Sequence, residues 1–443
     1  MATTTWTFYA GTRTIGGNII QVEHDGYRLL FDMGRAFRSD IPIFDGTLRE
    51  RGIRDLVRVG VAPDIDNLFT APADPKLAIA LSHCHLDHTG LLPYVLSGTR
   101  VFLSTDTFRM LSALDEIGEG PGQTLDYTPL AYGVRVSHGP ISVHFHRVDH
   151  DTPGASSIFI ETPDVRLLYS GDLRLHGAHP EWTREFAQLA RAFQPHALFI
   201  EGTRAIGEES VTTEAELSDL ALQLTANSAG GAYFNAYRRH PERYLAFYNA
   251  AKQTGRTLIL QPETAYLVHV FEGLADFAVW SDPSIQLSQP VRDWIAEKQI
   301  PSVTANDVAH REASYLMELT YDRFWLLSDI APEAGGVFMH ANGSPLGPYD
   351  PAWDNMLRWL EHYGLAFESI GSTGHASRNE ICAIIEEIQP QVVMPIHSFN
   401  PERIGSTSVR RILPELLRPY TLASLADAPY PTEADLAPTV EEA

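Results

Sequence analysis

Short apolar runs separated by turn signals dominate the first 205 residues, and they predict a layered α/β or α+β unit. The stretch 18–34, "NIIQVEHDGYRLLFDMG", alternates apolar and polar positions and breaks at Asp25-Gly26, as a β-hairpin does. The run 76–83, "KLAIALSH", is apolar almost throughout, which favours a strand buried on both faces. Helical spacing follows at 106–118 and 180–193.

The pattern of apolar and polar positions changes near residue 206. Amphipathic helices are expected at 214–226, 240–255, 264–280 and 351–365, alternating with strands at 257–262 and 322–328. The buried-strand pattern returns in "QPQVVMPIH" (389–397), before a Pro/Ala-rich acidic tail. The expected organisation is a first α/β unit over 1–205, a second over 206–365, a closing segment of the first over 366–420 and a flexible tail over 421–443.

Composition narrows the class of protein. A chain of 443 residues is long enough for two or three domains. It has no apolar run near the roughly 20 residues that span a bilayer, and its start is not that of a signal peptide. With only Cys84 and Cys382, no disulfide framework is expected, so we predict a cytoplasmic protein without a membrane partner. The formal charge of −23 opposes loose nucleic-acid binding but does not exclude a local basic channel.

The stretch 81–90, "LSHCHLDHTG", is the main candidate for chemistry. Alternate residues of an extended chain point the same way, so His83 and His85 can both coordinate one cation. Asp87 and His88 follow where the chain turns into a helix, and they can reach a second position beside it. Imidazole and carboxylate together suit Zn²⁺, with Mn²⁺ or Fe²⁺ as alternatives.

The remaining ligands are expected at the ends of distant strands. His150, Asp172 and His397 each follow an apolar strand and can enter a common cleft, with Asp172 as the bridging carboxylate. We expect one ion to be held by His83, His85 and His150, and the other by Asp87, His88 and His397. Cys84, between two ligands, is expected to point the opposite way into packing.

These residues resemble a known family. "SHCHLDHTGLLPY" is similar to the signature loop of the metallo-β-lactamase fold, and Asp32, His150 and Asp172 occur in the order that this superfamily uses. The resemblance implies an αββα sandwich in which Asp32 does not bind metal but hydrogen-bonds within the signature loop.

Three downstream residues resemble one branch of that family, the β-CASP nucleases, which include bacterial ribonuclease J and the endonuclease of pre-mRNA 3′-end cleavage. Glu201 falls at the acidic motif A, His375 in "GSTGHAS" at motif B, and His397 at motif C. The resemblance implies that 206–365 is an inserted β-CASP domain between two segments of the metallo-β-lactamase domain. Histidine at motif C is typical of members that cut RNA.

The function implied is a two-metal phosphodiesterase that cleaves single-stranded RNA by a metal-bridged hydroxide, in exo- or endonucleolytic mode. Asp87, Glu201 and His375 are the expected catalytic residues, with His375 as a general acid oriented by Glu201. Phosphate contacts are expected from Arg238, Arg239, Ser372 and Ser377. Homo-oligomerisation stays open.

Several alternatives stay open. The acidic charge favours a metallohydrolase of a small ester, lactone or nucleotide, whereas the inserted unit with Glu201 and His375 disfavours it. A non-catalytic scaffold is a third hypothesis. Among single residues, His375 could instead cap a helix, and Arg238 and Arg239 could be solvated. Ser398 and Phe399 after His397 depart from the Gly-Glu that is usual in ribonuclease J.

Overall fold

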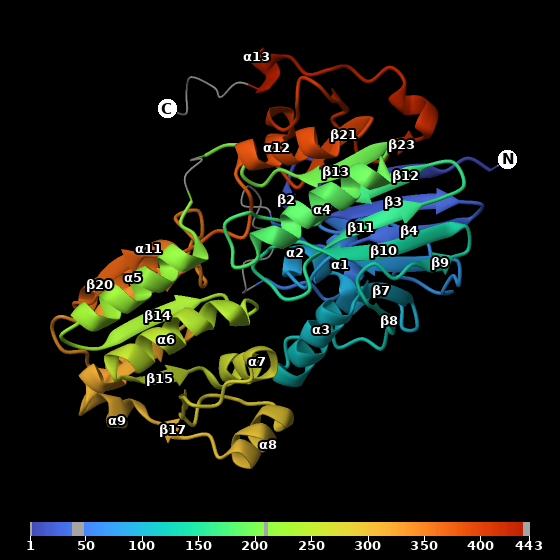
Figure 1. The fold of residues 1–443 in the computed structure, drawn as a ribbon. Coiled ribbons are helices and arrows are strands. Elements are labelled where there is room, and N and C mark those ends of the chain that lie inside the picture. Colours follow the sequence, from blue (N-terminus) through green and yellow to red (C-terminus); the bar gives the residue numbers. More distant parts are fainter. Residues whose placement is uncertain (1, 38–47, 208–210, 437–443) are drawn as a thin grey trace. The chain divides into compact units, whose positions relative to one another are not determined.

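The computed structural model describes residues 2–37, 48–207 and 211–436, and the chain divides into two compact units (Figure 1). The first unit comprises Met1–Leu111, Pro121–Val211 and Gly374–Ala443, and the second comprises Ser112–Gly120 and Thr212–Thr373. The chain re-enters the first unit at Gly374, whereas the hydrophobic pattern suggested residue 366. The short excursion 112–120, at the end of a helix, has no signal in that pattern.

The first unit contains two seven-stranded sheets. The first sheet has the order β23-β1-β3-β4-β6-β7-β8, with β1 (Thr5–Ala10), β3 (Ile19–His24), β4 (Tyr27–Phe31), β6 (Leu77–Leu81), β7 (Arg100–Ser104), β8 (Asp126–Leu130) and β23 (Pro419–Tyr420). The second has the order β22-β21-β13-β12-β11-β10-β9, with β9 (Val136–His138), β10 (Ile141–Arg147), β11 (Ser156–Glu161), β12 (Arg166–Tyr169), β13 (Ala197–Glu201), β21 (Val392–Ile396) and β22 (Arg410–Arg411). A separate two-stranded ribbon pairs β2 (Ile15–Gly16) with β5 (Ala36–Phe37).

Local sequence explains these strands. The predicted hairpin is confirmed, since β3 and β4 pair antiparallel around Asp25 and Gly26, whose φ values of 51° and 74° suit a tight turn. Residues facing between the two sheets, such as Phe31, Ala80 and Phe145, form one buried cluster. Both faces of β6 are buried, as its continuous apolar run predicted.

Helices cover the outer faces of this sandwich. Two helices, α4 (Pro180–Phe193) and α12 (Arg378–Ile388), pack on the second sheet through residues such as Phe186 and Ile385 (Figure 1). The first sheet carries the crossover helices α2 (Leu86–Thr89) and α3 (Thr105–Ile117) between its parallel strands, and α1 (Ile53–Arg58) precedes β6. The expected αββα sandwich is confirmed.

The second unit is a parallel sheet covered on both faces, which confirms the additional α/β domain. Its order is β17-β16-β15-β18-β14-β19-β20, with β14 (Ala232–Ala236), β15 (Thr257–Leu260), β16 (Ala278–Trp280), β17 (Ser302–Val303), β18 (Tyr315–Glu318), β19 (Val337–Ala341) and β20 (Ala366–Ser369). One face packs against α5 (Glu214–Asn227), α6 (Tyr244–Thr254), α7 (Pro262–Glu272) and α8 (Gln289–Lys298). The other packs against α9 (Ala305–Ala309), α10 (Leu326–Ile330) and α11 (Trp353–His362).

Two predicted elements of this unit are wrong. The helix expected over 264–280 ends at Glu272, because Gly273 adopts a left-handed φ of 70° and the chain then forms β16. The strand expected over 322–328 is instead a short 3₁₀ turn followed by α10. A short apolar run cannot by itself distinguish a buried helix from a strand.

The acidic tail is docked as far as the structure describes it. Leu425 and Ala428 are 3% and 8% exposed and pack against the cluster between the sheets, and α13 (Glu433–Leu436) follows. Burial of these apolar side chains holds 421–436 in place, contrary to the flexible tail expected from composition. Residues 437–443 lie outside the described residues. Within 2–37, 48–207 and 211–436, no helix combines the length and apolar character needed to cross a bilayer.

Candidate metal centre

The histidine-rich stretch joins β6 to α2 and places its side chains at one edge of the sandwich. His83 follows β6, His85 caps the N-terminus of α2, and Asp87 and His88 lie within that helix. The parallel strands β12, β13 and β21 end at the same edge, as does antiparallel β10. His150, Asp172 and His397 follow three of these strands and are almost completely buried.

The predicted ligands come together in two groups. Within each group the ligand atoms lie within 4.8 Å of one another: His83, His85 and His150 in the first, and Asp87, His88, Asp172 and His397 in the second. Asp172 lies between them. Its Oδ2 is 3.0 Å from Nε2 of His88 and 3.4 Å from Nε2 of His397, and it also lies 3.8 Å from Nε2 of His83. One carboxylate can therefore serve both positions.

Hydrogen bonds to the outer ring nitrogens orient these histidines. Nδ1 of His150 lies 2.6 Å from the carbonyl oxygen of Gly374, which can only accept, so that nitrogen carries the proton. Nδ1 of His397 lies 2.7 Å from the hydroxyl of Thr203. In both residues Nε2 is left to face the centre, which is the arrangement that supports a metal ligand.

Asp32 anchors a network that reaches both groups. Nδ1 of His88 lies 2.7 Å from its Oδ2, and the Tyr169 hydroxyl donates to the same oxygen at 2.6 Å. The Ser82 hydroxyl also donates to Oδ2 at 2.8 Å and lies 2.9 Å from Nδ1 of His83. Asp32 holds a left-handed φ of 56°, which is uncommon outside glycine and typical of functional sites. Asp32 thus contacts His88 directly and reaches His83 through Ser82, and among the described residues it belongs to none of the ligand groups.

The electrostatics of the centre fit divalent cations. Burial, together with the neighbouring His88, lowers the pKa of His83 well below its usual range. Burial also lowers the pKa of His85 to about 3. Burial would raise the pKa of Asp172, but His397 and His88 hold it well below the ordinary value. Nε2 of His83 and Oδ1 of Asp172 are buried without a hydrogen-bond partner among the described residues, as expected of ligand atoms. The neutral imidazoles of His83 and His85 beside an ionised Asp172 form a donor set for a divalent cation. Burial would lower the pKa of His88, but Asp172, Asp87 and Asp32 raise it well above its usual range, so His88 would have to release a proton to bind an ion.

Glu201 and His375 form a pair next to the centre. Nδ1 of His375 lies 3.0 Å and 3.1 Å from the two oxygens of Glu201, which also accept the N–H groups of Leu173 and Thr203. Burial would lower the pKa of His375, but Glu201 and Asp172 raise it to about 9. Together with Asp172 this pair makes a third grouping of ligand-type atoms. The hydrogen bonds that Glu201 accepts leave it better suited to orienting His375 than to holding an ion.

Comparison with known proteins decides the family. The sequence-family model of the metallo-β-lactamase superfamily matches residues 14–202, which contain the signature loop, His150 and Asp172. The chain is a metallo-β-lactamase superfamily protein. It is distantly related to ribonuclease J, a β-CASP family protein, which confirms the resemblance noted in the sequence.

The similarity extends over most of the chain. Ribonuclease J of Pyrococcus abyssi is 22% identical over 87% of this chain and 88% of its own length. Ribonuclease J of Methanocaldococcus jannaschii is 24% identical, with 88% and 90% covered. A crystal structure described as that of a protein of unknown function from Enterococcus faecalis V583 has a TM-score of 0.79 and 27% sequence identity, covering 95% of this chain and 100% of the other.

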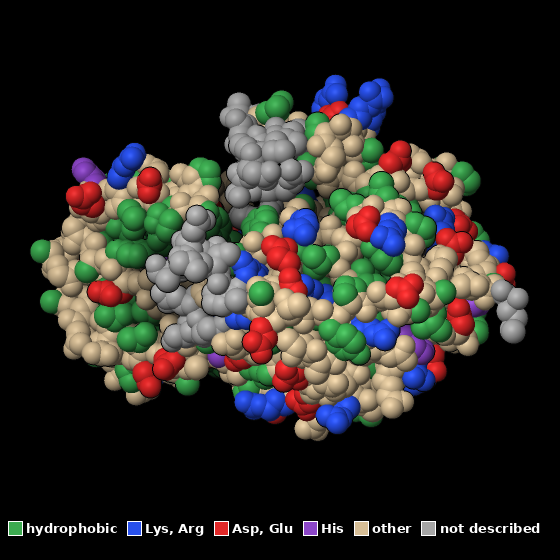
Figure 2. Space-filling view, turned by 90° about the horizontal axis from the view of Figure 1, so that it is seen from above, with side chains coloured by type: hydrophobic (Ala, Val, Ile, Leu, Met, Phe, Trp, Pro, Cys, Tyr) green, Lys and Arg blue, Asp and Glu red, His purple; other side chains and the backbone are tan. Residues whose placement is uncertain are grey.

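The expected phosphate contacts occupy other environments in this metallo-β-lactamase superfamily protein. Arg238 donates to Glu119 at 2.6 Å, and NH2 of Arg239 lies 3.9 Å from the same carboxylate. Ser377 is the N-cap of α12, where its hydroxyl accepts the N–H of Glu380 in a capping box. Ser372 is fully buried in the second unit. On the face shown in Figure 2, Lys/Arg and Asp/Glu side chains are interspersed.

Other features near the centre had a weak signal in the sequence or none. Thr203, which contacts His397, lies two residues beyond Glu201, and nothing in its context marks it. Asp151 directly follows His150, but adjacency in the sequence does not by itself show that its carboxylate borders the first ligand group. The thiol of Cys84 is directed at the Thr107 carbonyl oxygen at 3.3 Å, within the fold.

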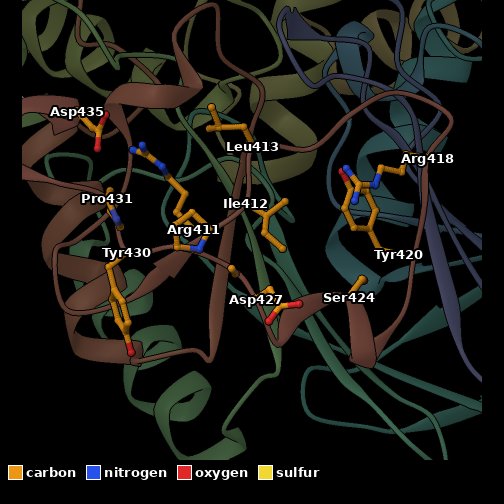
Figure 3. A pocket seen from close by; sticks show the side chains of 12 residues that line it. Arg411, Ile412, Leu413, Arg418, Tyr420, Ser424, Asp427, Tyr430, Pro431 and Asp435 are labelled. Atoms are coloured by element: carbon orange, nitrogen blue, oxygen red, sulfur yellow. The ribbon is translucent and has the colours of Figure 1, made fainter.

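A groove of about 600 Å³ is lined by residues between 411 and 435, within the last segment of the first unit (Figure 3). Its lining includes Arg411, Tyr420, Tyr430 and Asp435, and it contains none of the metal-centre residues. The candidate metal centre and this groove are therefore separate features of the first unit.

Proposed function

We propose that this protein is a metal-dependent ribonuclease that hydrolyses phosphodiester bonds in single-stranded RNA. The observation that carries the proposal is the Glu201–His375 pair beside two ligand groups that share Asp172. A two-ion hydrolase of a small substrate needs no such added pair. The relation to ribonuclease J over most of the chain supports RNA as the substrate class. Zn²⁺ suits the imidazole-rich ligands, with Mn²⁺ as the alternative.

Two divalent cations held by these residues would supply a water activated near neutral pH and compensate charge on the phosphate. The chain's own residues determine where this happens. Asp172 would be shared by the two ions, because its Oδ2 lies near histidines of both groups. Asp32, Gly374 and Thr203 hold His88, His150 and His397 in the ring orientation that directs Nε2 inward.

His375 is the proposed general acid. Its Nδ1 is engaged by Glu201, so a proton on Nε2 is available to the departing 3′-oxygen of the RNA. The carboxylate of Glu201 stabilises the protonated ring, whose pKa is raised to about 9. Cations bound in the centre would lower this pKa toward neutrality, where a general acid is most effective.

The decisive experiment offers the metal-loaded protein RNAs labelled at either end, carrying a 5′-phosphate or a 5′-hydroxyl, beside ester, lactone and nucleotide substrates. We expect RNA to be cleaved, and the labelled products to distinguish exo- from endonucleolytic cutting. Asp87→Ala should abolish cleavage. His375→Ala should slow single-turnover cleavage by about 10²–10⁴-fold, with RNA binding retained. The partly exposed His179 provides the control variant His179→Ala, which should cleave normally.

A second candidate is a metallohydrolase acting on a small ester, lactone or nucleotide. The pairing of Arg238 with Glu119 at 2.6 Å favours it, because that guanidinium group already has a carboxylate partner inside the second unit. Turnover of such a substrate by a protein that leaves RNA intact would replace the ribonuclease proposal with this one.

A further inference from the structure

Asp151 lies against the first ligand group, although neither the hydrophobic pattern nor the signature loop points to it. It directly follows His150, and its side chain is 13% exposed. Its Oδ1 lies 3.3 Å from Nε2 of His150 and 3.6 Å from Nε2 of His85. The Nε2 atom of His150 is the nitrogen that faces the centre, so this carboxylate oxygen borders the first metal position.

A glycine distant in the sequence makes room for this carboxylate. A Cβ atom on Gly374 would lie 2.4 Å from Oδ1 of Asp151, closer than real Cβ contacts come. The carbonyl oxygen of the same glycine accepts the Nδ1 proton of His150. Gly374 therefore orients one ligand and leaves the space in which Asp151 reaches that ligand's inner nitrogen.

The distances agree with a shared ion. Donor atoms about 2.0–2.2 Å from one cation, at angles between 90° and the tetrahedral value, are separated by about 2.8–3.6 Å. The 3.3 Å between Oδ1 of Asp151 and Nε2 of His150 falls in this interval, and so does the 3.2 Å between Nε2 of His150 and Nδ1 of His85. Asp151 is therefore placed to share an ion with Nε2 of His150. Its 3.6 Å contact with His85 is to Nε2 of that ring, whereas Nδ1 of His85 is the atom nearest His150.

We propose that Asp151 is a further ligand of the first metal ion, in addition to His83, His85, His150 and the shared Asp172. The proposal rests on the proposed two-metal function. It gives this ion five protein ligands, of which two are carboxylates. A more oxygen-rich and higher-coordinate position shifts preference from Zn²⁺ toward Mn²⁺ or Fe²⁺, relative to three histidines and one carboxylate. The two metal positions then differ in the ion that they favour.

Metal binding by the full-length protein tests this directly. Chelator-treated wild type, Asp151→Asn and the control Asp126→Asn, whose side chain is 55% exposed, are titrated with Mn²⁺ and with Zn²⁺ by calorimetry. We expect Asp151→Asn to weaken Mn²⁺ at one of the two sites by more than about 100-fold, beyond the range typical of an outer hydrogen-bond partner. The loss for Zn²⁺ should be smaller, and the control should bind like wild type.

Spectra of the Co²⁺-loaded protein give a second readout that does not depend on RNA cleavage. Loss of a fifth ligand should change the visible Co²⁺ absorption of one site toward the stronger bands of four-coordination. If Asp151→Asn does not fold, Gly374→Ala serves instead, because its Cβ would displace the carboxylate. If Asp151→Asn lowers the affinities for Mn²⁺ and Zn²⁺ equally and only modestly, and leaves the Co²⁺ spectrum unchanged, the proposal is overturned. Failure to cleave RNA with these metal results intact would overturn only the proposed function.

Discussion

Asp32→Asn is the perturbation that best tests how the metal centre is organised. The carboxylate of Asp32 is fully buried and accepts four hydrogen bonds. Oδ1 accepts the N–H of Ser82, and Oδ2 accepts from the Ser82 hydroxyl, the Tyr169 hydroxyl and His88. Asparagine has nearly the same shape and also tolerates a left-handed backbone, so the substitution changes charge and hydrogen bonding rather than conformation.

The loss in free energy of unfolding caused by Asp32→Asn follows from these contacts. The amide places its oxygen toward the three donors on the Oδ2 side, and its NH₂ group then faces the N–H of Ser82, which had been bonded at 2.7 Å. Losing that acceptor costs about 1.5–3 kcal/mol. The three remaining bonds lose their charge assistance, at about 0.5 kcal/mol each. We expect a total of about 3–5 kcal/mol, a large part of the stability of an ordinary domain.

The assay compares urea unfolding of chelator-treated wild type, Asp32→Asn and Asp25→Asn. Asp25 is the matched control, because it also has a left-handed φ, of 51°, but lies exposed in the β3–β4 turn. Its variant should stay within about 0.5 kcal/mol of wild type. Asp32→Asn should also weaken metal binding about 10–100-fold by releasing His88. A wild-type urea midpoint together with wild-type metal affinity would refute this account.

Three further predictions concern the centre and the second unit. Adding the metal ion to the metal-free protein at 100 times Kd should raise the free energy of unfolding by about 2.7 kcal/mol per site, measured as a higher Tm. An unchanged Tm would contradict metal binding at the buried centre. Cys84→Ser should retain both ions, because the thiol faces Thr107, and loss of an ion on metal analysis would show otherwise. Burial raises the pKa of Glu318 from 4.5 to about 6, so its destabilising charge is absent below pH 4.5 and fully present above pH 6. Urea unfolding should therefore show Glu318→Gln gaining about 2 kcal/mol on wild type between pH 4 and pH 7, and parallel pH profiles would contradict this.

Local patterns were sufficient where the determinants lie close together in the sequence. The spacing of His83, His85, Asp87 and His88 is a property of one strand end and the helix that follows. The more distant ligands could be anticipated because each follows a buried strand, and such strand ends meet at one edge of a sheet. The β3–β4 hairpin was predictable for the same local reason.

Determinants that depend on distant pairing had no such signal. Arg238 was interpreted as a phosphate contact, and its partner Glu119 lies 119 residues away in the segment that joins the second unit. Asp151 gains its position from Gly374, whose lack of a side chain matters only once the fold brings the two together. Ser377 is expected from the sequence as a phosphate contact, and in the fold it is the N-cap of α12, where its hydroxyl accepts the N–H of Glu380.

The charge of the chain gains a specific meaning from the centre. A formal charge of −23 opposes an RNA substrate, and two arginines considered for phosphate contact lie beside Glu119. The ligand set itself contributes Asp87, Asp172 and, in our proposal, Asp151. Binding of two divalent ions would add four positive charges to a centre that holds these three carboxylates. A phosphate would then be attracted more strongly by the loaded centre than by the empty one, so that metal binding and substrate binding are coupled through charge.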